Sequence, residues 1–370
     1  MHIGVPLEVR AGERRVAATP ETVKKLAARH AVRIQAGAGL GANITDAEYE
    51  AAGAQIVSTA EALYAASDLV LKVRGLEEPE FPLVKKGSLI AGLLSPHDRE
   101  KMAAYAVHGL TAFAMESIPR ISRAQSMDVL SSQANIGGYK SVILAADAYG
   151  RFFPMLMTAA GTVKAARVLV LGVGVAGLQA IATAKRLGAV IEAFDVRPAV
   201  KEQVLSLGAK FVEVPLAEGE SAETSGGYAR EMSEDYKKRQ AELIEARAIQ
   251  SDIVITTALI PGKPAPVLLK EETVKSMKHG SVVVDMAVEF GGNCPLSEKD
   301  RVVEKHGVTL IGYTNLPAMM AADASALYAR NMLNFINLLF DPKSGDLNIN
   351  REDEIISGTL VSINGELVKK

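Results

Sequence analysis

The feature that most constrains the fold is a glycine-rich turn between a short apolar run and a helical pattern in mid-chain. Residues 167–171 (Arg-Val-Leu-Val-Leu) are followed by Gly172-Val-Gly-Val-Ala-Gly177 and then by a helix-forming run to Leu187. A second apolar run, at 190–194, leads directly into Asp195. A strand, a G-x-G-x-x-G turn, a helix and a second strand closed by an acid are typical of a Rossmann-type dinucleotide-binding unit.

Each glycine of this turn has its own expected task. Gly172 permits the tight turn, Gly174 lets backbone N–H groups approach a pyrophosphate, and Gly177 lets the helix pack closely on the strand. The pyrophosphate is then held at the positive end of the helix. The alternative, a strand-to-helix turn that binds no ligand, is disfavoured by the complete context of the motif.

The acid that closes the second strand predicts which dinucleotide is bound. A carboxylate at Asp195 accepts hydrogen bonds from both ribose hydroxyls and repels a 2′-phosphate, which favours NAD over NADP. Arg197 lies two residues further on and is the kind of residue that attracts a phosphate. Asp195 occupies the deciding position, so the sequence predicts NAD.

The bulk composition excludes several classes of protein. With 370 residues the chain is long enough for two α/β domains, and its net charge of −2 comes without a long basic run, so nucleic acid binding is not expected. Cys294 is the only cysteine, which rules out an intrachain disulfide and fits a reducing compartment. The apolar stretch 168–184 is short and interrupted by glycines, so we expect no direct membrane insertion.

Short apolar runs alternate with amphipathic segments along most of the chain, which predicts parallel sheets covered by helices. Helices are expected from Pro20, from Asp46 and after Ser58, whose spacing to Glu61 fits a capping box, and later at 125–151 and 327–340. A hairpin is expected around Asn364-Gly365. The predicted strands are 3–6, 32–35, 68–73, 88–94, 110–115, 167–171, 190–194, 210–214, 252–257, 281–286 and 308–311.

These elements predict an α/β fold of two Rossmann-like domains with parallel sheets around a cleft. Residues 1–125 together with 320–370 form the first, flavodoxin- or Rossmann-like domain, because the C-terminal segment is expected to pack back on it. Residues 126–319 form the second domain, which carries the dinucleotide-binding motif.

Two polar segments stand out from this regular pattern. Residues 216–236 are polar and contain glycines, and such a segment is either a functional lid or a solvated connector. The segment from Arg120 to Gln133 combines Arg, Gln, Asp and Ser, which suits hydrogen bonding to a carboxamide, a ribose and a pyrophosphate. On composition alone the second segment is equally a polar helix start.

Acid–base and metal chemistry have few candidates. The six histidines are scattered singly and Cys294 has no partner, so no metal site is expected. His97, in a loop beside an expected helix start, is either a catalytic acid or base or a surface histidine, and the surface interpretation is favoured.

Several long segments resemble the NAD(H)-binding domain I of proton-translocating NAD(P)⁺ transhydrogenase, within the alanine dehydrogenase/transhydrogenase superfamily. The resemblance covers essentially the whole chain. It implies the split-gene bacterial form of the enzyme, in which the α1 subunit is a separate soluble polypeptide. The segments that carry it are 120–133 (Arg-Ile-Ser-Arg-Ala-Gln-Ser-Met-Asp-Val-Leu-Ser-Ser-Gln), 172–188, 226–229 (Gly-Gly-Tyr-Ala), 256–266 (Thr-Thr-Ala-Leu-Ile-Pro-Gly-Lys-Pro-Ala-Pro) and 289–296 (Glu-Phe-Gly-Gly-Asn-Cys-Pro-Leu).

The resemblance implies roles for individual residues. The nicotinamide end of NAD(H) would be held, and presented for transfer, by a loop with Arg120, Gln125, Asp128 and Ser131 as catalytic residues and with Ile121, Ser122, Ser126 and Met127 beside them. Tyr139 would lie near that loop. The pyrophosphate would meet Gly172, Val173, Gly174, Val175 and Gly177, and the adenosine ribose Asp195, Val196 and Arg197. Gly227 and Tyr228 would belong to a mobile loop that closes over the nucleotide, with Gln240 and Leu259 as further contacts.

The implied function is hydride transfer between NAD(H) on this chain and NADP(H) on a partner subunit, coupled to proton translocation. Such a transfer needs close positioning and exclusion of water but no general acid. The resemblance further implies a homodimer, an NADP(H)-binding subunit and membrane-spanning subunits as partners. The chain would then be cytoplasmic, at the inner face of the membrane through those subunits.

Two other functions remain as alternatives. Arg15 and Lys72 match substrate-binding positions of alanine dehydrogenases, which would make the chain an amino-acid dehydrogenase acting alone. However, the catalytic histidine of those enzymes falls near Ser95, or at His97 with a shifted alignment, and their catalytic aspartate position is Glu289. The third possibility is a regulatory module that senses NAD(H). Oxidation of alanine, or binding without restored transhydrogenation, would distinguish these alternatives.

Overall fold

The computed structural model describes residues 1–214, 233–260, 262–341 and 343–368. They divide into two compact units, 1–133 with 317–370 and 134–316. One long helix, α5 (Val129–Ala148), begins in the first unit and continues into the second. Among the described residues, no helix is both long enough and apolar enough to cross a membrane.

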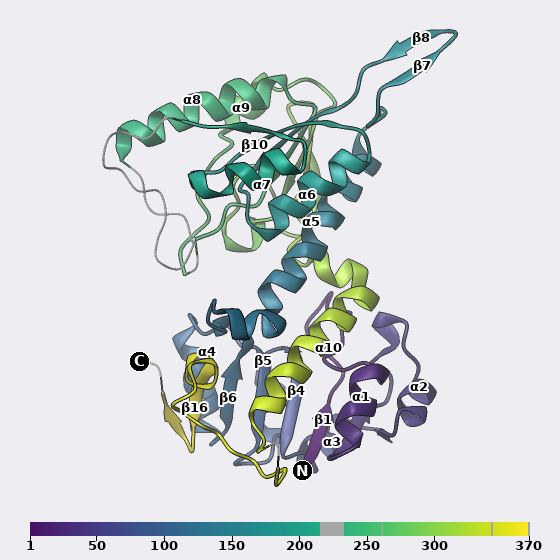
Figure 1. The fold of residues 1–370 in the computed structure, drawn as a ribbon, viewed down its shortest axis with the longest axis vertical. Helices are drawn as coiled ribbons and strands as arrows, with labels where there is room; N and C mark the ends of the chain where they lie inside the picture. Colours follow the sequence, from purple (N-terminus) through teal and green to yellow (C-terminus); the bar gives the residue numbers. More distant parts are fainter. Residues whose placement is uncertain (215–232, 261, 342, 369–370) are drawn as a thin grey trace. The chain divides into compact units, whose positions relative to one another are not determined.

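The first unit is built on an eight-stranded sheet (Figure 1). Six parallel strands have the order β3-β2-β1-β4-β5-β6, which is the Rossmann order. The antiparallel strands β16 and β17 extend the sheet beyond β6. The bounds are β1 His2–Val5, β2 Ala31–Gln35, β3 Gln55–Val57, β4 Leu69–Arg74, β5 Leu89–Leu93, β6 Thr111–Ala114, β16 Leu360–Ile363 and β17 Glu366–Leu367.

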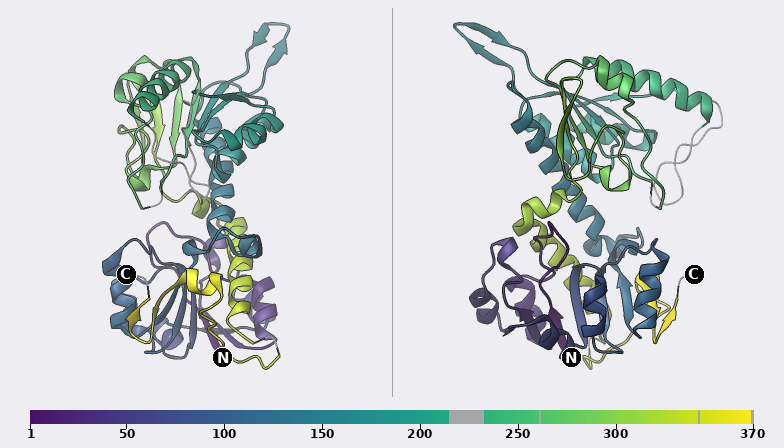
Figure 2. Two further views of the ribbon diagram at one scale, coloured as in Figure 1. Left: turned by 60° about the vertical axis from the view of Figure 1, so that its left-hand side comes forward. Right: turned by 180° about the vertical axis from the view of Figure 1, so that it is seen from behind.

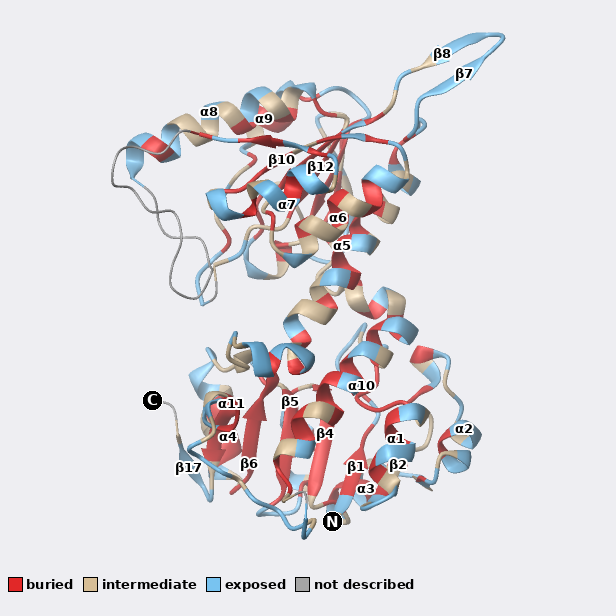
Figure 3. Ribbon diagram, in the orientation of Figure 1, coloured by how far each residue is buried: buried red, intermediate tan, exposed pale blue. Residues whose placement is uncertain are grey.

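Helices cover both faces of this sheet, because its strands are apolar on both sides. Leu71 and Val73 of β4 belong to the core beneath α1 and α10, whereas Val70 belongs to the core beneath α3 and α4. Figure 3 shows the strands buried and the outer sides of the helices exposed. The helices are α1 Pro20–Ala27, α2 Asp46–Ala51, α3 Ala60–Ala65, α4 Arg99–Val107, α10 Ala321–Leu338 and α11 Glu354–Thr359.

The second unit contains a seven-stranded sheet with the order β11-β10-β9-β12-β13-β15-β14. Its six parallel strands again follow the Rossmann order, and only the edge strand β14 is antiparallel. The strands are β9 Arg167–Leu171, β10 Val190–Phe194, β11 Lys210–Val212, β12 Ile253–Thr256, β13 Val282–Asp285, β14 Val302–Lys305 and β15 Val308–Ile311. The helices beside α5 are α6 Val175–Arg186, α7 Lys201–Ser206, α8 Glu234–Gln250 and α9 Glu271–Ser276.

A two-stranded hairpin, β7 (Leu156–Thr158) and β8 (Gly161–Val163), extends away from the rest of the second unit (Figure 2). Among the described strands, these two pair only with each other. Met155 and Met157 are 61% and 73% exposed, so apolar surface is displayed on this hairpin.

The expected α/β class with two Rossmann-like sheets is confirmed, with corrections in detail. The sheets are not wholly parallel, because β14 pairs antiparallel with β15, β16 with β6, and β17 with β16 at their edges. Thr59, not Ser58, caps α3, since the Thr59 hydroxyl accepts from the amide of Ala62. The helix expected at 125–151 is shorter in the structure. Residues Ser122–Met127 form the 3-10 helix η4, and α5 begins only at Val129 and ends at Ala148.

Candidate functional site

The glycine turn of the second unit has the backbone that its sequence predicts. Gly172 has a φ of +95°, a conformation that side-chain-bearing residues rarely adopt. A Cβ on Gly177 would lie 2.0 Å from the carbonyl oxygen of Gly172, so α6 packs too closely on the turn to admit one. A Cβ on Gly174, by contrast, would meet no described atom within 4 Å. Gly172 and Gly177 are therefore required by the fold, whereas Gly174 borders open space.

Gly174 is also the N-cap of α6, and no side-chain hydrogen bond from the described residues caps this helix end. The first amides of a helix have no partner within the helix, and together with the helix dipole they favour an anion. The turn lies at the carboxyl end of β9, beside β12, where the strand order reverses. Open α/β sheets bind their ligands at this position.

Asp195 lies against this turn. Asp195 is buried, and its carboxylate accepts a hydrogen bond of 2.7 Å from the amide of Val173. The same carboxylate accepts from Arg197, through the backbone N at 2.9 Å, Nε at 2.9 Å and Nη2 at 2.8 Å. The structure thus joins Val173, Asp195 and Arg197, three residues that the sequence assigned to the pyrophosphate and ribose. Val196, between them in the chain, is half-buried.

The loop after β12 forms a second side of the site. The Thr257 hydroxyl donates to the carbonyl of Gly172 at 2.9 Å and so ties this loop to the glycine turn. Leu259, expected to contact the nucleotide, is 40% exposed on the same loop. Thr257 is not among the site residues that the sequence predicts. It directly follows the buried strand β12, which pairs with β9, and a polar residue at such a position indicates a site residue.

Asn293 holds both ends of this loop. Its side chain accepts from Ala258 N at 3.1 Å and donates to Ala258 O at 2.9 Å and Pro266 O at 2.8 Å. Asp285, at the end of β13, in turn accepts from the amide of Asn293 at 3.2 Å. Neither side chain is exposed to solvent. Asn293 and Asp285 are positioning residues that the sequence did not single out, since their bonds join segments far apart in the chain.

In the first unit, the expected nicotinamide loop is held firmly. Asp128 accepts from the Ser131 amide at 2.9 Å and from its hydroxyl at 2.5 Å, which caps the start of α5. Asn331 Nδ2 donates to the Ser126 carbonyl at 2.8 Å, and Arg123 pairs with Asp353 at 2.8 Å. The interpretation of this segment as a polar helix start therefore fits Asp128 and Ser131.

Other members of the loop face outward. Arg120, Ser122 and Gln125 are exposed, whereas Ile121 is half-buried and Met127 packs into the core. Because the backbone of this loop is already fixed, a ligand bound by these Arg and Gln side chains would have to order only the side chains and not the loop.

The remaining expected site residues lie on separate elements or outside the described residues. Tyr139 is 39% exposed on α5, and Gln240 is half-buried on α8. Gly227 and Tyr228 lie outside the described residues. His97 is exposed in the turn before α4, which agrees with the surface interpretation. The described residues contain no group of three or more His, Cys, Asp or Glu side chains that could hold a metal ion.

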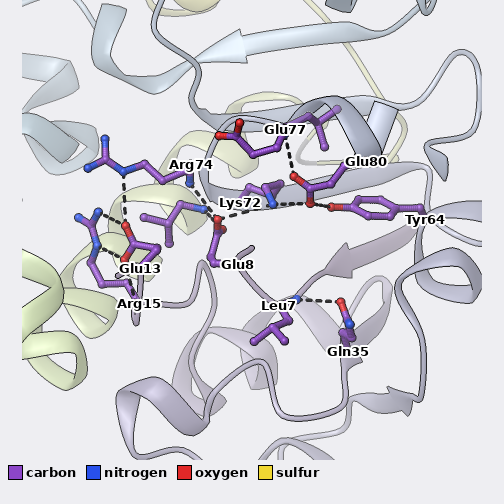
Figure 4. Close-up of polar contacts among 12 residues, drawn as sticks. Leu7, Glu8, Glu13, Arg15, Gln35, Tyr64, Lys72, Arg74, Glu77 and Glu80 are labelled. Carbon is purple, nitrogen blue, oxygen red and sulfur yellow. Dashed lines mark hydrogen bonds and ion pairs between the residues drawn. The ribbon is translucent and has the colours of Figure 1, made fainter. Parts of the chain in front are cut away.

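A buried ionic cluster lies in the first unit, at the end of β4 (Figure 4). Lys72, which is fully buried, lies 2.7 Å from Glu80 and 3.6 Å from Glu8. Tyr64 donates its hydroxyl to Glu80. Burial raises the pKa of Glu8 to about 7, although the Lys72 ammonium and a hydrogen bond from Val73 act in the opposite direction. The cluster comprises Glu8, Glu13, Arg15, Lys72, Arg74 and Glu80.

Arg15 belongs to the other half of this cluster. Its Nη2 and Nε contact the two oxygens of Glu13 at 2.6 and 2.8 Å, and its Nη1 donates to Gln133 at 2.8 Å. Arg15 is 3% exposed. Both cations suggested as binders of a small substrate are therefore paired with carboxylates of the chain itself.

Comparison with known proteins gives a consistent assignment. The family model of the alanine dehydrogenase/PNT N-terminal domain matches residues 4–137, and that of the C-terminal domain matches residues 141–370. The chain is 54% identical to the first part of the NAD(P) transhydrogenase subunit alpha of Rhodospirillum rubrum, over 100% of this chain and 98% of that protein. It is 30% identical to the alanine dehydrogenase of Mycolicibacterium smegmatis, over 92% of this chain and 88% of that enzyme.

The fold comparison agrees with the sequence comparison. A crystal structure of transhydrogenase from Sinorhizobium meliloti matches with a TM-score of 0.89 and 47% identity, covering 99% of this chain and 100% of that one.

Proposed function

The chain belongs to the alanine dehydrogenase/PNT family, and on that premise we propose that it is the NAD(H)-binding component of a proton-translocating NAD(P) transhydrogenase. The family implies binding of a nicotinamide nucleotide. The observation that carries the proposal is the bond from Val173 N to Asp195, which places a carboxylate beside a glycine turn at the point where the strand order reverses.

The proposed site begins at the glycine turn. The amides of Val173, Gly174 and Val175 would bind the pyrophosphate, because they lead into the N-terminus of α6. Asp195, with Val196 and Arg197 beside it, would bind the adenosine ribose, and the Asp195 carboxylate would select NAD(H). Thr257, Leu259 and Gln240 would line the rest of the nucleotide, with Gly227 and Tyr228 as further nucleotide-binding residues.

The nicotinamide end is assigned to residues of the first unit. Arg120 and Gln125 are exposed, Gln125 on η4, and would hold the carboxamide and phosphate oxygens. Asp128 and Ser131 fix the start of α5 and would set the position of that loop. Ile121, Ser122, Ser126 and Met127 complete the loop, and Tyr139 on α5 would be a further nucleotide-binding residue.

Bound NAD(H) would supply a nicotinamide carbon that gives or accepts a hydride. The second nicotinamide would belong to NADP(H) on a partner subunit. Transfer between two such carbons moves no proton at the reacting atoms, so the chain must position the ring and exclude water.

The main alternative, an amino-acid dehydrogenase, is disfavoured by the buried ionic cluster. A substrate carboxylate needs a cation to bind, yet Arg15 is paired with Glu13 and Lys72 with Glu80. Breaking buried ion pairs of this kind is costly, because it leaves a charge without its partner. In addition, the position of the catalytic aspartate in alanine dehydrogenases is occupied by Glu289.

We further propose a homodimer and membrane-bound partner subunits. The hairpin β7–β8 exposes Met155, Leu156 and Met157 and pairs with no other described strand, which is the kind of surface that a second copy covers. Docking on membrane-spanning subunits would place the chain at the cytoplasmic face of the membrane.

Reconstitution tests the whole proposal. Purified protein is titrated with NADH in a calorimeter, then mixed with membranes that contain the partner subunits but lack this one. We expect NADH binding by the chain alone and NADH-dependent reduction of NADP⁺ only in the mixture. Absence of NADH binding would refute the proposal, and NAD-dependent oxidation of alanine by the chain alone would establish the alternative.

A further inference from the structure

The carboxylate of Asp195 is already saturated with hydrogen bonds. Oδ1 accepts from the backbone N and the Nε of Arg197, and Oδ2 accepts from Val173 N and the Nη2 of Arg197. An ionised carboxylate offers about four lone-pair sites, and all of them are used here. A nucleotide ribose must therefore displace donors before its hydroxyls can bind Asp195.

The donors differ in how easily they can leave. Two are backbone amides, fixed by the turn that follows β10 and by the glycine turn. The other two belong to the Arg197 guanidinium, whose side chain can rotate away. The exchange thus replaces the bonds of Arg197 by the bonds of the ribose and leaves the amides in place.

The positive charge of Arg197 also changes the electrostatic potential at the site where the adenosine ribose would bind. The Asp195 and Arg197 side chains are 6% and 15% exposed, so solvent screens their charges weakly. Asp195 alone would repel a 2′-phosphate, whereas the guanidinium beside it offsets that repulsion and can itself pair with phosphate oxygens.

We propose that Arg197 sets the nucleotide discrimination of this site, by limiting the preference for NADH over NADPH that the Asp195 carboxylate alone would impose. This inference rests on the proposed function and extends it to a specificity-determining residue. Asp195 supplies the preference, and Arg197 reduces it in two ways. It occupies the ribose acceptor in the free protein, and it supplies a positive charge near the 2′ position.

The test measures the ratio of the dissociation constants, Kd for NADPH divided by Kd for NADH, by calorimetry on the full chain. Arg197→Met keeps much of the apolar volume but removes the charge and the fork of donors. Its ratio should rise about tenfold, since a hydrogen bond to a charged group is worth about that factor or more. Arg197→Lys keeps the charge, so its ratio should stay closer to that of the unmodified protein.

Arg301→Ala is the matched control, because Arg301 forms an exposed ion pair with Glu298 at 3.2 Å in the same unit. Its ratio should not change. A ratio that is unchanged or lower in Arg197→Met, with NADH still bound, would overturn this inference and leave the proposed function intact. If the unmodified protein bound no NADH, the proposed function would fail, and this inference with it.

Discussion

Asn293 and Ala258 form a closed pair of hydrogen bonds, in which the side-chain amide accepts from Ala258 N at 3.1 Å and donates to Ala258 O at 2.9 Å. A second donor bond, to Pro266 O at 2.8 Å, fixes the far end of the same loop. The loop carries Leu259 and adjoins the glycine turn through Thr257. A single buried amide therefore determines the shape of one side of the candidate site.

Substitution of Asn293 tests this positioning role. Asn293→Leu leaves three backbone groups without their partner, so we expect a loss of about 2–4 kcal/mol in the free energy of unfolding and a weaker affinity for NADH. Asn293→Asp keeps the acceptor for Ala258 N but loses both donor bonds, and its affinity should also fall. Urea unfolding and calorimetry are the measurements. Unchanged NADH affinity in both variants would show that the loop is not part of the site.

Substitution by alanine should affect a different property at each of two glycines of the turn. Gly177→Ala places a methyl group 2.0 Å from the Gly172 carbonyl, so α6 must move, and we expect a loss of about 3 kcal/mol or more of stability. Gly174→Ala adds a methyl group in open space at a φ of −81°. Its stability should change little, while NADH affinity falls, because the methyl group keeps the pyrophosphate from the backbone.

Thermal unfolding followed by circular dichroism, together with NADH titration, separates the two effects. Equal loss of stability in both variants would contradict the account of the turn. Full NADH affinity in Gly174→Ala would show that no phosphate approaches the backbone there.

Prediction from sequence succeeds best where the signal is local. The strands 167–171, 190–194 and 308–311 have the predicted bounds in the structure, because an apolar run bounded by glycines or polar residues defines each of them. The edge strand β14 (Val302–Lys305) is not predicted, because its sequence Val-Val-Glu-Lys contains only two apolar residues. In the structure this strand is exposed or half-buried. Secondary structure at a sheet edge depends on its neighbour more than on its own side chains.

Parts of the candidate site cannot be predicted for a similar reason. The sequence indicates that Asp195 closes β10, but not that Arg197 occupies its carboxylate. Likewise Lys72 and Glu80 are separated in the sequence by a loop, and only the fold brings them to 2.7 Å. The tertiary structure determines which buried charges pair with each other. A local pattern of residue types does not contain that information.

Glu8 should make stability depend on pH. Its pKa is about 7 in the folded protein against 4.5 as the reference, so the folded state binds more protons between these values. Stability should therefore fall as pH rises from about 4.5 to 7 and level off above, with Glu8 contributing at most about 3 kcal/mol of that loss. Glu8→Gln removes the ionisation, so its stability relative to the unmodified protein should increase between pH 5 and pH 8.

Urea unfolding at the two pH values provides the comparison. Glu48→Gln is a suitable control, because Glu48 is exposed and its pKa is lowered by hydrogen bonds from Thr45. A difference between Glu8→Gln and the unmodified protein that is the same at pH 5 and pH 8 would show that Glu8 does not titrate in this range.

The hairpin β7–β8 should control the oligomeric state. Met157 is 73% exposed on the hairpin, so Met157→Asp should cost little in an isolated chain but would place a charge in the proposed apolar interface between two copies. We expect the apparent mass in sedimentation equilibrium to fall from that of a dimer to that of a monomer. Val107→Asp, at the exposed end of α4, is the control and should leave the mass unchanged. Dimers of undiminished stability in Met157→Asp would exclude the hairpin from the interface.

Gln125 should affect the rate of hydride transfer more than the binding of NADH. Its side chain is exposed on η4, whose backbone is fixed at Ser126 by Asn331 and Asn334, so shortening it by one methylene leaves the loop in place. Gln125→Asn would move the amide away from the proposed position of the nicotinamide, and a misplacement of about 1 Å can slow a reaction about a hundredfold. We therefore expect an NADH affinity within about threefold of the unmodified value and a much slower single-turnover transfer in the reconstituted enzyme. Lost affinity with fast transfer would instead make Gln125 a binding residue without a part in positioning the nicotinamide.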